Sequence, residues 1–171
     1  MRLKNHVDEK SMKDTSFSCL EEKNYKSWKE VKSMHLKEKI VTIIGGQRTG
    51  VLSTVRENKP HSAFMMFFHE DFVLYIATDR KSKKITDIEN NPNVHVLLGR
   101  EGKKLDEDYI EVEGVASIEE DPTLKNKFWN NSLKRWLLGA EDPNYVLIKI
   151  NPDTIYYIDG AGTTEPEFLR L

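Results

Sequence analysis

The chain has 171 residues, of which 38% are hydrophobic and 32% charged, and its formal net charge is −2. This length suffices for one domain with a sizeable core, and the interspersed charges argue against a general nucleic-acid binder, which would present a basic face. No apolar run is long enough to span a membrane, and no signal-peptide pattern follows Met1, so we expect a cytoplasmic protein. The single cysteine, Cys19, excludes an intrachain disulfide, and no His/Asp/Glu spacing indicates a metal site.

The first part of the chain is polar and then becomes periodic. Residues 1–25 are charged and lack apolar periodicity, so we expect a loose extension that holds at most a short helix. From Trp28 to Ile44 apolar side chains recur at helical spacing, which predicts an amphipathic helix that ends at Gly45-Gly46. The β-branched run 40–44 is equally compatible with a strand.

The next part of the chain carries strand signals. Apolar runs at 51–55, 61–68 and 72–78 are separated by turn-forming residues, which predicts a meander of antiparallel hairpins. A helix follows over 82–91, because Ser82 is a good N-cap residue and isoleucines then recur at helical spacing. Pro92 disfavours a helical conformation in the residue before it and so marks the helix end.

Strand patterns return after this helix. Residues 94–98 form one apolar run, and 109–119 alternate between apolar and polar residues, with Gly114 as a candidate bulge or bend. Pro122, preceded by an aspartate cap, begins a further helix, and a second helical piece follows it. Residues 145–158 read as a terminal hairpin that turns at an Asn-Pro-Asp sequence.

These elements amount to about six strands with three or four helices. Because most connections are short, the strands should pair antiparallel, and closing them into a small barrel removes exposed edges. We therefore expect a mainly β (α+β) protein, a six-stranded antiparallel barrel with flanking helices. Residues 160–171 contain Gly, Thr and Pro and are expected to form a loose tail.

The start of the predicted helix 82–91 has an unusual charge. A helix N-terminus is partially positive and prefers acidic residues, yet Lys83 and Lys84 occupy its first turn, with Arg80 and Lys81 just before it. A phosphate held by the free backbone N–H groups and clamped by lysine would explain this pattern. Charge alone favours the alternative, a solvated lysine-rich turn.

Several short motifs then occur in the order and spacing of a known family. They are Thr54, Pro60-His61-Ser62, Met65-Met66, Leu74–Asp79, Ser82-Lys83-Lys84, Asn91–Val94, Phe128-Trp129-Asn130, Lys134-Arg135-Trp136 and Asp142-Pro143-Asn144. Together they resemble the general stress protein 26 group of the pyridoxamine 5′-phosphate oxidase-like, FMN-binding split-barrel superfamily. The resemblance implies that residues 26–159 form a split-barrel domain, and that the protein is a homodimer with FMN in a cleft between subunits.

The resemblance also implies roles for individual residues. The strand residues Ser62, Ala63, Phe64, Met65 and Met66 would pass along the flavin ring and ribityl chain. Ala77 and Thr78 would close over the ring, and Ser82, Lys83 and Lys84 would hold the phosphate. Tyr109 would contribute from the same or the partner subunit, and Trp129 with Trp136 would line the substrate side. Ala63-Phe64 departs from the family, which often has Arg-Pro there, with the arginine helping to bind phosphate.

The same residues could instead have purely structural roles. The run from Met65 to Phe68 is typical of core strands, and the two tryptophans could pack in the core. His61 could donate a proton near the flavin or simply face solvent.

Two classes of function follow from the resemblance. The first is a flavin-dependent oxidoreductase with a small-molecule electron donor and acceptor, in which FMN carries the chemistry and no general base is required. The second is a non-enzymatic protein that binds or sequesters FMN. Pyridoxamine phosphate oxidase activity is a weaker third reading, because those enzymes carry a C-terminal Arg-x-His element and here no histidine follows Arg170.

Overall fold

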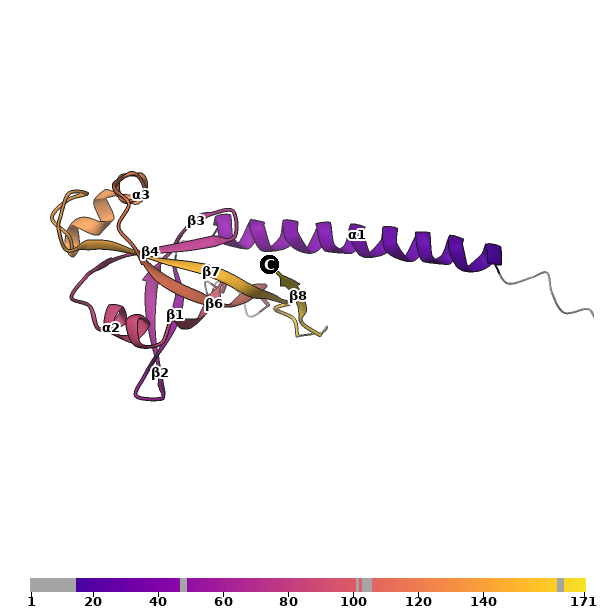
Figure 1. Cartoon of the computed structure of the whole chain (residues 1–171), viewed down its shortest axis with the longest axis horizontal. Helices are drawn as coiled ribbons and strands as arrows, with labels where there is room; N and C mark the ends of the chain where they lie inside the picture. The colour runs from indigo at the N-terminus through magenta and orange to yellow at the C-terminus, as the bar shows by residue number, and fades with distance from the viewer. Residues whose placement is uncertain (1–14, 47–48, 101, 103–105, 163–164) are drawn as a thin grey trace, which may run out of the picture. The chain divides into compact units, whose positions relative to one another are not determined.

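An antiparallel sheet with helices beside it dominates the described part of the chain, which comprises residues 15–46, 49–100, 102, 106–162 and 165–171 of a computed structural model (Figure 1). These residues divide into two units, one that ends at His35 and one that begins at Leu36. The sheet, its core and the candidate site all belong to the second unit. No helix in the described ranges is long and apolar enough to cross a membrane.

The first helix, α1, runs without a break from Thr15 to Gly46. The expectation of a loose segment up to residue 25 is therefore wrong for Thr15 onward, while residues 1–14 lie outside the described part. Leu36, Ile40 and Ile44 are buried and recur every four residues, so one helical stripe joins the core. This spacing also decides between helix and strand for 40–44, and the helix ends at Gly45-Gly46 as predicted.

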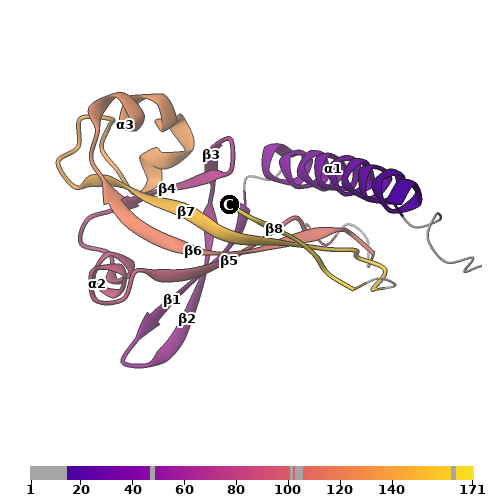
Figure 2. The ribbon, with the colours of Figure 1, turned by 45° about the vertical axis from the view of Figure 1, so that its right-hand side comes forward.

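A single curled sheet contains all the strands of the described residues. The strands are β1 (Thr49–Arg56), β2 (Lys59–Met66), β3 (Phe68–Glu70), β4 (Val73–Asp79), β5 (Asn93–Leu98), β6 (Tyr109–Glu119), β7 (Tyr145–Ile158) and β8 (Glu167–Arg170). Their order is β2-β1-β5-β6-β7-β4-β3, every pairing is antiparallel, and β8 adds to β7. Although β2 and β4 lie towards opposite edges in this order, they contact each other, so the sheet curls into an incompletely closed barrel (Figure 2). The predicted split barrel is confirmed, with eight strands instead of six.

Three local differences distinguish the observed strands from the predicted ones: two add a strand and one removes a strand. The run 61–68 divides at the buried Phe67 into β2 and β3, so the predicted meander is broken there. The predicted loose tail includes β8. The predicted terminal hairpin is wrong, because β7 continues through Pro152 as one strand of 14 residues.

Gly114 explains how proline fits inside β7. The register between β6 and β7 shifts between Glu113, which pairs with Thr154, and Gly114, which pairs with Pro152, so Asp153 has no partner on β6. This β-bulge interrupts the ladder next to Pro152, where the missing N–H of proline is tolerated. A Cβ on Gly114 would meet the Asn151 carbonyl oxygen and lie 3.0 Å from Pro152 Cα. The prediction of a bulge or bend at Gly114 is confirmed.

Two hydrophobic clusters lie on opposite faces of β4. Leu74 and Ile76 belong to the larger cluster inside the barrel, whereas Tyr75 and Ala77 contact a smaller cluster. Helix α3 (Pro122–Phe128) and the 3-10 helix η1 (Asn131–Arg135) contribute Phe128 and Leu133 to this smaller cluster. The alternating side chains of β4 thus separate the barrel interior from the helical insert.

Helix α3 begins as predicted, with the Asp121 carboxylate accepting hydrogen bonds from the backbone N–H groups of Thr123 and Leu124 at 2.7 and 3.1 Å. The helix ends at Phe128, and Trp129 has an extended backbone. Trp129 and Trp136 therefore do not share one continuous helix.

Candidate functional site

Helix α2 (Lys83–Asn90) lies at one end of the barrel and carries the lysines on which the candidate site depends. Ser82 precedes it with the extended backbone of an N-cap residue, φ −68° and ψ 142°, which confirms the predicted helix start. The Ser82 hydroxyl makes no capping hydrogen bond to the helix. It lies 3.3 Å from Thr78 Oγ1, which donates to it, so β4 and the start of α2 are linked by a side-chain contact.

Asp87 fastens α2 to β1 through a buried carboxylate. Its Oδ1 accepts from Arg56 Nε at 2.7 Å, and its Oδ2 accepts from Arg56 Nη2 at 2.8 Å and from Thr54 Oγ1 at 3.0 Å. The hydrogen bonds from Arg56 lower the pKa of Asp87 below its ordinary value, against the opposing effect of burial. A charged, fully bonded carboxylate at this position holds the helix in one orientation relative to the strand.

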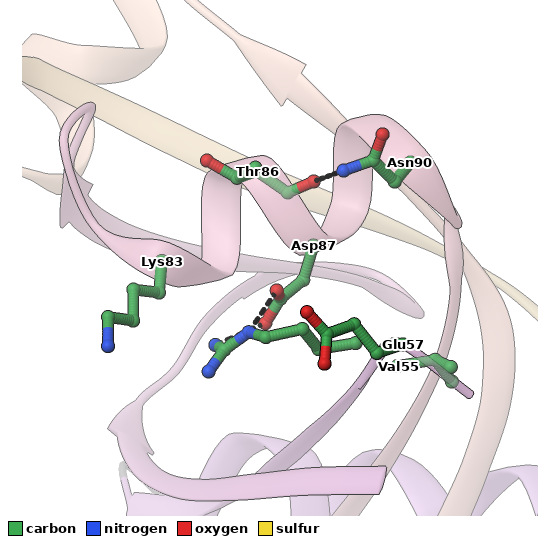
Figure 3. Close-up of a pocket in the computed structure, with 7 residues that line it drawn as sticks. Val55, Glu57, Lys83, Thr86, Asp87 and Asn90 are labelled. Carbon is green, nitrogen blue, oxygen red and sulfur yellow. Dashed lines mark hydrogen bonds and ion pairs between the residues drawn. The ribbon is translucent and has the colours of Figure 1, made fainter. Parts of the chain in front are cut away.

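A pocket of about 530 Å³ opens beside this ion pair. The residues that line it are Val55, Arg56, Glu57, Lys83, Thr86, Asp87 and Asn90. Lys83 and Asp87 project from the same side of α2, as expected for residues four apart (Figure 3). Lys83, in the basic first turn of α2, and Arg56, at the end of β1, therefore line the same pocket.

The three predicted phosphate residues have different surroundings. Lys83 is exposed and lines the pocket, whereas Lys84 is half-buried and is not among the lining residues. Ser82 is half-buried and contacts Thr78. All three lie within one turn of the α2 start, so they are close enough to share one anion.

The predicted ring-binding residues of β2 alternate between two sheet faces. Ala63 pairs with the buried Leu52 and so faces the barrel interior, as does Met65. Ser62, Phe64 and Met66 face outward, where Ser62 Oγ lies 2.8 Å from Ser53 Oγ and Phe64 is 80% exposed. Ala63 and Met65 therefore lie on the core side of β2, whereas Ser62, Phe64 and Met66 lie on its outer side.

Ala77 and Thr78 likewise have opposite orientations. Thr78 is buried and bonds to Ser82, while Ala77 contacts the smaller hydrophobic cluster, to which Trp129 also belongs. The Trp129 ring packs 5.7 Å from that of Tyr145, whose Cα partner on β4 is Asp79. Trp129 therefore packs against the smaller hydrophobic cluster and lies near the end of β4.

A second, aromatic pocket of about 340 Å³ adjoins Trp129. Its lining residues are Ile44, Gly45, Phe67, Phe68, His69, Lys127, Phe128, Trp129 and Asn130.

Tyr109 stands apart from the other predicted residues. It opens β6 and pairs with Ile158, next to the Ile110–Leu98 pair. At the opposite end of β7, Tyr145 pairs with Asp79, which lies four residues before Lys83. Because β7 has 14 residues and a strand rises by roughly 3.3 Å per residue, roughly 40 Å of strand separates the two pairs. One chain does not bring Tyr109 to Lys83 and Lys84.

The structure adds Arg56 and Asp87, which the sequence did not identify, and gives a contact to Thr54, which the sequence named only as part of the family resemblance. The alternation of β1 offered a signal, since Thr54 and Arg56 share a face with the buried Leu52. Asp87 offered another, because it interrupts the apolar face formed by Ile85 and Ile88. Their pairing across 31 residues had no signal in the sequence.

Comparison with known proteins identifies the fold and the family. A family model described as pyridoxamine 5′-phosphate oxidase matches residues 36–159, so the chain belongs to this family. General stress protein 26 of Bacillus subtilis (strain 168) is 40% identical over 136 residues, which cover 80% of this chain and 96% of that protein. The resemblance inferred from the sequence motifs is thereby confirmed.

Two solved structures have a fold similar to that of this chain. The crystal structure of general stress protein 26 from Bacillus anthracis str. Sterne superposes with a TM-score of 0.73 at 85% identity, over 80% of this chain and 99% of that one. An FAD-binding protein from Mesorhizobium loti superposes with a TM-score of 0.57 at 20% identity, over 68% of this chain and 89% of that one. At that identity the second match shows the fold alone.

Proposed function

We propose that the chain binds FMN with its phosphate at the start of α2, and that the bound flavin passes electrons or a hydride between a small-molecule donor and an acceptor. The observation that carries the proposal is the pair of lysines in the first turn of α2, which stand where a helix disfavours cations. Bound phosphate turns this unfavourable placement into a favourable one. FMN would supply the redox chemistry, and the protein would supply binding and orientation.

The residues present fit a phosphomonoester. The first backbone N–H groups of α2, the Ser82 hydroxyl and two lysine ammonium groups are all hydrogen-bond donors, and no acidic residue lies in the first turn. A dinucleotide would need a second phosphate site, and the sequence has no Gly-rich dinucleotide turn. The match to an FAD-binding protein makes the choice between FMN and FAD the sharpest test of the proposal.

The test is a set of titrations of flavin-free protein with FMN, FAD and riboflavin, followed by fluorescence or calorimetry. We expect FMN to bind most tightly, and riboflavin to be weaker because it lacks the phosphate. Tighter binding of FAD, or equal binding of FMN and riboflavin, would contradict the phosphate site. The visible spectrum of freshly purified protein and mass spectrometry of the released ligand give an independent answer.

We also propose a homodimer in which each flavin site uses both chains. Tyr109 lies too far from α2 to join its own site, so a contribution from Tyr109 requires the partner subunit. An apolar row also crosses the outer face of three neighbouring strands, where Phe64 pairs with Val51 and Val51 pairs with Leu97. A second copy would cover this row, and two-fold dimers are the commonest oligomers.

The second candidate is a protein that binds FMN without turnover. It is favoured by the lack of a catalytic constellation among the predicted site residues. Anaerobic addition of NADH or NADPH to the FMN-loaded protein, followed by an added acceptor, separates the two candidates. Bleaching and recovery of the flavin absorbance identify an oxidoreductase, whereas an unchanged spectrum identifies a binding protein.

A further inference from the structure

Arg56 is the most tightly positioned cation beside the pocket at α2. Two of its guanidinium nitrogens, Nε and Nη2, hold both oxygens of Asp87. The Asp87 side chain is 2% exposed and the Arg56 side chain 34%, so the carboxylate is buried while the Arg56 side chain is partly exposed and lines the pocket. The third bond to Asp87, from Thr54, fixes the carboxylate itself.

The rest of the guanidinium is available to a ligand. An arginine side chain has five N–H donors, and its remaining terminal nitrogen has no hydrogen-bond partner among the described residues. Arg56 and Lys83 line the same pocket, and Lys83 has no ion-pair partner within the described ranges either. The carboxylate of Asp87 is occupied by its three bonds. Glu57 is the other acidic residue of the pocket and is exposed. The hydrogen bond to Asp87 is the largest effect that raises the pKa of Arg56, and the charge of Glu57 contributes only the last of these effects.

We infer that Arg56 is an anion-binding residue of the flavin site, which holds phosphate oxygens together with Lys83 and is positioned for this by Asp87 and Thr54. This inference rests on the function proposed above. Guanidinium groups match the geometry of phosphate oxygens, and an arginine already fixed by a carboxylate loses little conformational freedom on binding. The ion pair thus connects the folding of α2 to recognition of the cofactor's phosphate.

A purely structural role makes a different prediction. If Arg56 only fastens α2 to β1, its loss shifts the lysines of α2, and Asp87→Asn, which breaks the same ion pair but keeps the guanidinium, should weaken FMN by the same factor. If Arg56 contacts phosphate, Arg56→Ala should weaken FMN more than Asp87→Asn does, while riboflavin changes little in either variant. An equal loss of FMN affinity in the two variants would overturn the role of Arg56.

The experiment titrates FMN and riboflavin into the wild type, Arg56→Ala, Arg56→Lys, Asp87→Asn and the control Lys81→Ala, an exposed cation outside the pocket. We expect Arg56→Ala to weaken FMN by roughly ten- to a hundredfold and riboflavin by less than about twofold. Arg56→Lys should recover part of the loss, and Lys81→Ala should change neither ligand. Inorganic phosphate should compete with FMN in the wild type and less so in Arg56→Ala.

Stability is controlled with a second variant. If Arg56→Ala does not fold, the pair Arg56→Gln with Asp87→Asn removes both charges together and leaves neither ion buried alone. Equal losses for both ligands, or an unchanged preference for FMN, would overturn the role of Arg56. A wild type that binds FMN no more tightly than riboflavin would instead overturn the proposed function, so the two failures are distinguishable.

A substitution at Ala63 provides a test in which FMN affinity should be regained. By register its side chain faces the same side of the β1–β2 hairpin as Arg56. Ala63→Arg in the Arg56→Ala background should restore at least about tenfold of the FMN affinity if a guanidinium on this face is what matters. No recovery, in a variant that still binds riboflavin as the wild type does, would count against a phosphate on this face.

Discussion

Lys83 and Lys84 are neighbours in the sequence with different environments at the start of α2. Lys83 is exposed and lines the pocket, and Lys84 is half-buried beside it. An anion at the helix start would be held by both from different directions, with the backbone N–H groups between them. Each lysine should therefore matter to the phosphate and little to the fold.

We predict that Lys84→Ala weakens FMN binding by roughly ten- to a hundredfold, because a hydrogen bond to a charged group is worth about 1.5–3 kcal/mol. Riboflavin binding should hardly change, since riboflavin has no phosphate. Titrations of both ligands into Lys83→Ala, Lys84→Ala and the double variant provide the measurement. If neither ligand is affected, the lysines belong to a solvated turn.

Asp87 should give the fold a specific dependence on pH. Its pKa is lowered in the folded state, so its contribution to stability is present above its unfolded-state pKa and is lost as the pH falls through the folded-state value. We expect Asp87→Asn to lower the free energy of unfolding by about 3 kcal/mol at pH 7, with a smaller difference below about pH 4. Urea unfolding of both proteins at several pH values measures this.

Asp71 supplies the control for that measurement. It is an exposed aspartate in the turn between β3 and β4, with a φ of 50° that asparagine also adopts readily. Asp71→Asn should change stability by less than about 0.5 kcal/mol at any pH. A difference between wild type and Asp87→Asn that does not shrink in acid would show that the ion pair is not the source of the stability.

At the scale of elements, the bulge between β6 and β7 is the clearest determinant of the sheet. Gly114 is buried against the backbone of Asn151 and Pro152, which cannot move aside as a flexible side chain can. We predict that Gly114→Ala destabilises the protein by about 2–4 kcal/mol, as expected for overpacking against fixed atoms. Thermal unfolding measures the loss.

Gly139 is a matched control for Gly114. A Cβ built on it comes no closer than 4.0 Å to its nearest neighbour, the backbone nitrogen of Glu141. Gly139→Ala should therefore stay within about 0.5 kcal/mol of the wild type. If Gly114→Ala is no more destabilising than Gly139→Ala, β6 and β7 can change their register at the bulge to accommodate the added methyl group.

The secondary-structure elements also show which features local sequence patterns can predict. Alternation and turn residues predicted β1, β4, β5 and β6, and the Ser82 and Asp121 positions predicted both helix starts, because these signals are local. The Asn-Pro-Asp sequence at Pro152 has the local signature of a turn, but the partner strand with Gly114 accommodates it as a bulge. The Arg56–Asp87 pair depends on the packing of α2 against β1, which no local pattern encodes.

At the scale of the molecule, the outer sheet face should be an interface. Phe64 is 80% exposed and continues the apolar row through Val51 and Leu97. We predict that Phe64→Asp converts the proposed homodimer to a monomer and weakens FMN binding, because the proposed contribution of the partner's Tyr109 would then be lost. Light scattering at micromolar concentration measures the mass.

Leu138 provides the control for the interface. It is 93% exposed but lies after η1, away from the sheet. Leu138→Asp should leave both the mass and the flavin affinity unchanged. A monomeric wild type that holds flavin would contradict the dimer, and so would a Phe64→Asp variant that stays dimeric.

The position of β7 in the chain has a consequence for biosynthesis. β7 pairs with β6, β4 and β8, yet it follows both β4 and β6 in the chain and begins only at Tyr145. Until β7 has left the ribosome, β4 lacks this partner strand and the barrel cannot close. The apolar strands made earlier therefore remain without their native neighbours. Folding of the barrel is therefore expected only after β7 has been made, and truncated chains that stop before Tyr145 should be substrates for chaperones and proteases.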